Sequence, residues 1–123
     1  MKALKGQRAA QIASLADLAG MIEAGSLARL SAVSEERLAT LGALGRLQAD
    51  TSAAQDVGGL GDLCILARHQ QWRQHRRAAL NIRLAAQTAA WQDKRQKAAR
   101  DVARADVARR LAAKAMRERP RRG

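Results

Sequence analysis

The residues of this sequence that could do chemistry are few, and their spacing does not favour it. His69 and His75 are six residues apart and would lie on different faces of a helix, whereas a zinc-binding pair needs an i, i+4 spacing and further ligands. Cys64 is the only cysteine, and His69 would lie off its face and leave the thiol unactivated. We therefore predict no enzyme, no metal site and no cofactor, and we expect Cys64 to pack as a small apolar residue beside Leu63 and Ile65.

Residues 70–77 mix one aromatic residue with cations and amides, in the order Gln-Gln-Trp-Arg-Gln-His-Arg-Arg. Such a mixture could contact nucleic acid, with the ring of Trp72 stacking on a base and the arginines pairing with phosphates. It is also the composition of a soluble helix face, with Trp72 packed against a neighbouring helix. We favour this second interpretation.

Cations dominate the second half of the chain. Residues 62–123 contain seventeen Lys and Arg against five acidic residues, which accounts for the whole net charge of +12. Between residues 94 and 119 the cations would surround most of a helix, whereas a protein that reads duplex DNA usually gathers them on one face. This distribution suits a helix surrounded by its partner, or a solvated coiled-coil face. The candidate partner-binding residues are Arg100, Arg104, Arg109, Arg110, Lys114 and Arg117.

The composition predicts an all-α protein. The chain has 123 residues, no Phe, no Tyr and two Trp, and it is rich in Ala, Leu, Arg and Gln. A compact globule normally buries several aromatic residues, whereas this composition is typical of long helices and coiled coils. We expect residues 1–123 to form a single helical hairpin.

In the first half, apolar residues recur at steps of three and four, which indicates one face of a helix over about residues 3–49. Several glycines and the helix-start pattern Ser34-Glu35-Glu36 leave a kink or a break near Ser31–Ser34 open, but we prefer one long helix because no proline or polar linker separates the pieces. The predicted seam residues of this helix are Leu15, Leu18, Ile22, Leu30, Val33, Leu41 and Leu44.

A glycine-rich linker at residues 50–61 separates this helix from a second one, predicted over about residues 62–118. Gly58, Gly59 and Gly61 permit a reversal, and no Lys-Ser/Thr pair follows them as a phosphate-binding loop requires. Two series of residues spaced by seven predict a coiled-coil seam that is thin and Ala-rich toward the C-terminus. They are Leu84, Trp91, Ala98, Ala105 and Ala112, and Thr88, Arg95, Val102, Arg109 and Met116. Pro120 ends the helix, and residues 119–123 form a basic tail.

This layout resembles the FliJ family of flagellar export proteins and the related stalk proteins of type III secretion systems. The likeness lies in a small basic protein, a long antiparallel two-helix coiled coil and an Arg/Ala/Gln-rich second helix, and it covers most of the chain. The resemblance implies a cytoplasmic stalk, peripheral to a membrane-embedded export apparatus. Such a stalk enters the ring of the export ATPase, touches the export gate and escorts export chaperones. It implies no particular site residues.

Two other functions stay open from the sequence. A basic hairpin could bind nucleic acid or a ribosome through its Arg-rich second helix, at least nonspecifically. A cationic helix could also lie on anionic lipid, but an Ala-rich seam lacks the large apolar residues that such a helix buries in a membrane surface. The sequence has no apolar run of the length that a transmembrane helix needs.

Overall fold

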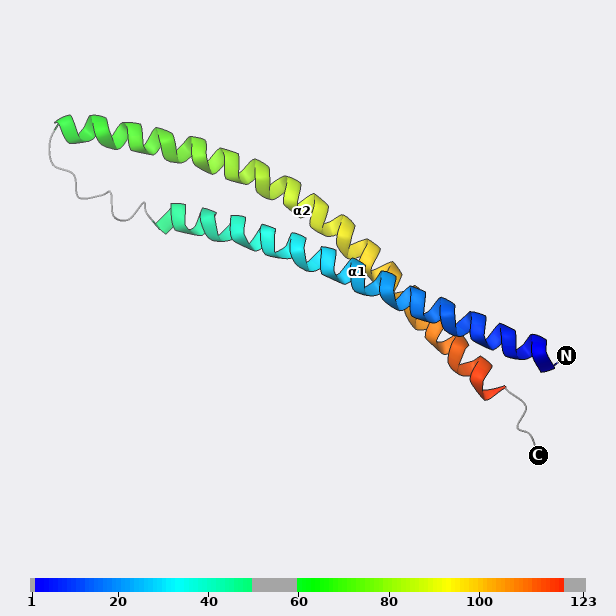
Figure 1. The fold of residues 1–123 in the computed structure, drawn as a ribbon. Coiled ribbons are helices and arrows are strands. Elements are labelled where there is room, and N and C mark those ends of the chain that lie inside the picture. Colours follow the sequence, from blue (N-terminus) through cyan, green and yellow to red (C-terminus); the bar gives the residue numbers. More distant parts are fainter. Residues whose placement is uncertain (1, 50–59, 119–123) are drawn as a thin grey trace. The chain divides into compact units, whose positions relative to one another are not determined.

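The computed structural model of the chain describes residues 2–49 and 60–118, which form two long helices (Figure 1). Helix α1 spans Lys2–Ala49 and helix α2 spans Leu60–Arg117, and the described residues contain no strand. The predicted all-α hairpin is confirmed. Helix α1 is continuous through residues 31–34, in agreement with the preferred single helix.

The boundaries of the helices lie close to the predicted ones. The predicted linker covers residues 50–61, of which residues 50–59 lie outside the described part of the chain, and Leu60 and Gly61 already belong to α2. Glu118 follows the last helical residue and closes a final turn, in which its backbone N–H donates to Lys114 O at 3.0 Å. The predicted tail at residues 119–123 also lies outside the described residues.

The contacts between the helices fall into two units. Unit 1 consists of Met1–Ser31 with Asp93–Gly123, and unit 2 of Ala32–Gln92. Each unit pairs a segment of α1 with a segment of α2. The pairing is antiparallel in both units. In unit 1 Glu23 contacts Arg109 and Ser26 contacts Asp101. In unit 2 Arg37 contacts Thr88 and Leu47 contacts Arg73.

Mostly small and polar residues form the contact between the helices in unit 1, and Ile12 and Leu30 are its two large apolar residues. On α1 the buried or partly buried positions repeat at steps of three and four, at Ala9, Ile12, Ala16, Ala19, Glu23, Ser26 and Leu30. On α2 they are Lys94, Ala98, Asp101, Ala105, Ala108, Ala112 and Ala115. This spacing is the heptad period of a coiled coil, and alanine at most positions lets two helix backbones approach closely.

The contact in unit 2 contains larger side chains. Leu44 and Leu47 of α1 and Leu80, Leu84 and Trp91 of α2 are buried or partly buried. They continue the same heptad spacing within their helices. Polar residues interrupt this contact as well, because Arg37, Thr40 and Arg73 occupy positions of the same series.

The packed faces differ from the predicted seam at eight positions. The structure leaves exposed the residues Leu15, Leu18, Ile22, Leu41, Arg95, Val102, Arg109 and Met116. The other predicted seam residues are buried or partly buried: Leu30, Val33, Leu44, Leu84, Thr88, Trp91, Ala98, Ala105 and Ala112. On α2 the second seven-residue series lies one residue earlier than predicted, at Gln87, Lys94, Asp101, Ala108 and Ala115. The physical reason is the size of the seam, because helices packed through alanine leave no room for Val102 or Met116 between them.

Candidate interaction surface

Two polar contacts connect the helices within unit 1. Ser26 Oγ donates a hydrogen bond to Asp101 Oδ2, and both residues are buried. Glu23 and Arg109 form an ion pair at one edge of the seam, where Glu23 is largely covered and Arg109 is about half exposed. Both contacts join residues more than seventy positions apart in the sequence, so they hold the two helices in one register.

In unit 2, Arg37 of α1 makes polar contacts with α2. Its guanidinium carbon lies 5.0 Å from the centre of the Trp91 ring, within the range of a cation–π interaction. Its Nε also donates to Thr88 Oγ1 at 3.1 Å. Trp91 is thus partly buried beside an arginine of α1.

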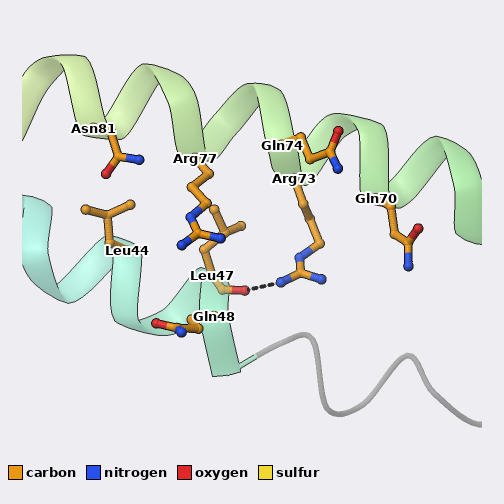
Figure 2. A pocket seen from close by; sticks show the side chains of 8 residues that line it. All are labelled: Leu44, Leu47, Gln48, Gln70, Arg73, Gln74, Arg77 and Asn81. Carbon is orange, nitrogen blue, oxygen red and sulfur yellow. Dashed lines mark hydrogen bonds between the residues drawn. The ribbon is translucent and has the colours of Figure 1, made fainter.

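A pocket of about 610 Å³ lies in unit 2 beside the end of α1 (Figure 2). Arg73 and Arg77 point from α2 toward α1, and Arg73 Nη2 donates to Leu47 O at 2.8 Å. The last carbonyls of a helix lack intrahelical donors and form the negative end of its dipole. Arginine at this place therefore caps α1. Apart from the two arginines, the side chains that line the pocket are apolar or amide, and none is a nucleophile or an acid–base group. The lining residues are Leu44, Leu47, Gln48, Gln70, Arg73, Gln74, Arg77 and Asn81.

The six predicted partner-binding cations are all exposed, but they are not equivalent. Arg109 pairs with Glu23 across the helices, and Arg110 Nη2 pairs with Asp106 Oδ2 at 3.0 Å along α2. Arg117 Nε lies 3.5 Å from Ala113 O on its own helix. For the remaining three, Arg100, Arg104 and Lys114, the described part of the chain provides no ion pair.

Large apolar side chains lie on the outside of unit 1, which the sequence reasoning missed. Leu15, Leu18 and Ile22 of α1 are 61%, 52% and 50% exposed, and Leu111 of α2 is 53% exposed. The sequence signal was present, because Leu15, Leu18 and Ile22 are spaced by three and four as a packed face would be. The pattern predicts a contact with α2, but alanine, serine and glutamate occupy that contact instead.

Trp72 and Cys64 are placed differently from our expectation. Trp72 is 57% exposed and does not pack against α1; its ring stacks on that of His69, with centroids 5.8 Å apart. Cys64 is exposed on α2, together with its neighbours Leu63 and Ile65. His75 is exposed as well.

Over residues 2–49 and 60–118, no group of three or more His, Cys, Asp or Glu side chains gathers closely enough to hold a metal ion. Neither α1 nor α2 contains a stretch of the length and apolarity required to cross a membrane.

The chain was compared with known proteins at three levels. Protein families, curated proteins and solved structures each gave no match.

Proposed function

We propose that this protein is a non-catalytic interaction protein, a helical hairpin that presents side chains to a protein partner. One observation carries the proposal: in unit 1 the small and polar residues face the other helix, while large apolar residues face outward. A monomer that served only its own stability would place Leu15, Leu18 and Ile22 between its helices, because burying each large apolar side chain gains about 1.5–3 kcal/mol. Contiguous exposed apolar residues mark interaction sites.

More specifically, we propose a stalk that enters the ring of a flagellar or type III export ATPase. The layout resembles such stalks, and the Ala-rich contact of unit 1 keeps the helix pair thin. The exposed cations of α2 in unit 1 would meet acidic side chains on the inner surface of the ring, where the rigid fork of arginine pairs well with carboxylates. They are Arg100, Arg104, Arg109, Arg110, Lys114 and Arg117. In this role the protein would act in the cytoplasm, peripheral to the export apparatus, and would also contact the export gate and export chaperones.

Charge reversal tests the stalk directly. Exposed ion pairs contribute only about 0–1 kcal/mol each, so several must change together. We expect the triple variant Arg104→Glu, Arg110→Glu and Lys114→Glu to lose its stimulation of ATP hydrolysis by the export ATPase ring. Its helical circular dichroism should be unchanged, because all three residues are exposed.

A matched control carries the same change of charge in unit 2, at Arg68, Arg76 and Arg83, which are exposed cations of α2. This control should stimulate the ring like the natural protein. Unaltered stimulation by the folded variant at positions 104, 110 and 114 would contradict the stalk.

Nucleic-acid binding is the second candidate, and the exposed Trp72–His69 stack is the observation that favours it. Exposed aromatic rings beside arginines can stack on unpaired bases, with about 1–3 kcal/mol per base. Under this alternative, Trp72→Ala should weaken binding of a single-stranded oligonucleotide near physiological salt. If the interaction is only electrostatic, the substitution changes little and the affinity falls steeply with salt, by about 0.9 log units per phosphate contact for each log unit of salt on duplex DNA.

A further inference from the structure

The two sides of the helix pair in unit 1 differ. On one side Arg109 pairs with Glu23, and the Cβ of an alanine at Gly20 would lie 4.0 Å from Arg109 Nη2. On α1, Gly20 directly follows the seam residue Ala19 and lies on this side. At 100° per residue, the residues directly before Ala16 and Glu23, which belong to the seam, lie on the opposite side. By the same spacing, the residues just before Ala105 and Ala112 of α2 lie on that side too.

We call this opposite side the leucine side and define it by Leu15, Leu18, Ile22, Arg104, Leu111 and Lys114, all of them exposed. Its apolar residues come from both helices. No described ion pair involves either of its cations, Arg104 and Lys114. The leucine side is therefore an apolar stripe bordered by positive charge.

The spacing of the stripe indicates the shape of its partner. Leu15, Leu18 and Ile22 follow one another at steps of three and four. A stripe with this period fits the side chains of another helix with a heptad repeat, as in a coiled coil. A flat sheet or a disordered polar segment would not match it.

The charge of the border indicates the sign of the partner. Arg104 and Lys114 would lie beside the flanking positions of a helix packed on the leucine side, and flanking charges set partner choice in coiled coils. Glutamate or aspartate at these positions of the partner complements them. A second copy of this chain fits poorly, because a twofold symmetric contact brings the same patch against itself and the chain carries a net charge of +12.

We propose that the leucine side of unit 1 is the docking site for an acidic amphipathic helix of a different protein. The inference rests on the proposed role as an interaction protein and deepens it, by naming the surface and the class of its partner. This helix would become the third helix of the coiled coil of unit 1 and would cover Leu15, Leu18, Ile22 and Leu111.

The test uses the full chain and a labelled synthetic peptide of about four heptads, with leucine at the seam positions and glutamate at the flanking positions. We expect the acidic peptide to bind the natural protein by fluorescence anisotropy. The variant Leu15→Ser with Ile22→Ser should bind it at least about tenfold more weakly, with unchanged circular dichroism. The control variant Leu38→Ser with Ile82→Ser removes two apolar residues of unit 2 that are more exposed than Leu15 and Ile22, and it should bind like the natural protein.

A second peptide with lysine in place of every glutamate should bind at least about tenfold more weakly than the acidic one. Three outcomes would overturn the inference: no binding of the acidic peptide, equal binding of both peptides, or undiminished binding by the Leu15/Ile22 variant. A dimer of the natural protein in analytical ultracentrifugation that the Leu15/Ile22 variant loses would assign the surface to a second copy and overturn it as well.

The two proposals can fail separately. If the Leu15/Ile22 variant loses the acidic peptide but charge reversal leaves the ATPase ring stimulated, the stalk is wrong and the docking site stands. If the ring responds to charge reversal while the peptide ignores Leu15 and Ile22, the docking site is wrong and the stalk stands.

Discussion

Asp101 is a costly residue to place between two helices. Its neighbours along the seam of α2 are Ala98 and Ala105, and burial of a carboxylate is unfavourable unless hydrogen bonds compensate it. Ser26 supplies one such bond from α1. A serine and an aspartate that meet in this way fix which turn of α1 lies against which turn of α2, which a uniform row of alanines does poorly.

Two variants separate the stabilisation by this hydrogen bond from the cost of burying the carboxylate: one removes Ser26 alone, and the other removes Ser26 and Asp101 together. Ser26→Ala leaves the buried Asp101 carboxylate without this donor, and we expect the free energy of unfolding to fall by about 1–3 kcal/mol. The double variant Ser26→Ala with Asp101→Ala extends the alanine row on both helices. It should recover most of the loss or exceed the natural stability. Urea unfolding followed by circular dichroism measures both. Equal destabilisation by the single and the double variant would contradict this expected recovery.

Helix α1 contains five described glycines, an unusual load for a helix of 48 residues. Glycine lowers helix stability because it has more conformational freedom to lose. At Gly45 an added Cβ would meet nothing within 4 Å, so alanine fits there without displacing any neighbour. Packing therefore does not explain why glycine stands at this position.

We expect Gly45→Ala to raise the free energy of unfolding by about 0.5–1 kcal/mol. The opposite change at an exposed position of the same helix, Ala39→Gly, should lower it by a similar amount. Thermal unfolding of the two variants beside the natural protein measures both effects. A Gly45→Ala variant without any gain would mean that the last turns of α1 contribute nothing to the cooperative transition.

The helices themselves could be predicted from the sequence, because composition and the scarcity of helix-breaking residues decide them. The seam could be predicted where it is apolar, at Leu30, Val33, Leu44 and Leu84. Ala98, Ala105 and Ala112 of α2 could be predicted as well, because they continue the seven-residue series of Leu84 and Trp91. The seam of α1 in unit 1 and the second series of α2 could not be predicted, because alanine, serine and acidic residues occupy them. The sequence pattern treats the largest apolar residue as the most buried, so it selects Leu15 over Ala16 and Val102 over Asp101. Only the distance between the helix backbones, which is a tertiary property, reverses that choice.

The candidate site could likewise be predicted only in part. The six cations could be selected from their charge, but the ion pairs that engage Arg109 and Arg110 depend on where Glu23 and Asp106 lie. The exposure of Trp72 could not be foreseen either. A tryptophan flanked by polar residues fits a packed position and a solvent-facing one equally well until the register of the helices is known.

At the scale of the whole molecule, the two units should differ in local stability. Unit 2 packs leucines and Trp91, whereas unit 1 packs mainly alanines, and apolar burial stabilises by about 25 cal/mol per Å². In native-state hydrogen exchange, we expect the amides of α2 near Ala105 to exchange faster than those near Leu80. The acidic peptide should slow exchange in unit 1 and leave unit 2 unchanged. Equal protection of the two regions in the unbound protein would contradict this difference.

The alanine contact also determines which substitutions the protein tolerates. Ala105 has 0% exposure and Ala98 has 2%, so any larger side chain at either position must push the helices apart, at a cost of typically about 1–3 kcal/mol. Leu15 and Leu18 border open space and accept many residues without loss of folding. In most proteins, substitution of large apolar residues disturbs folding most. In a mutational scan of this protein scored for folding alone, the smallest apolar residues should instead tolerate substitution least, and the largest should tolerate it best. The same scan scored for partner binding should restore the leucines to the sensitive class, and the positions that change class between the two scores would outline the interface.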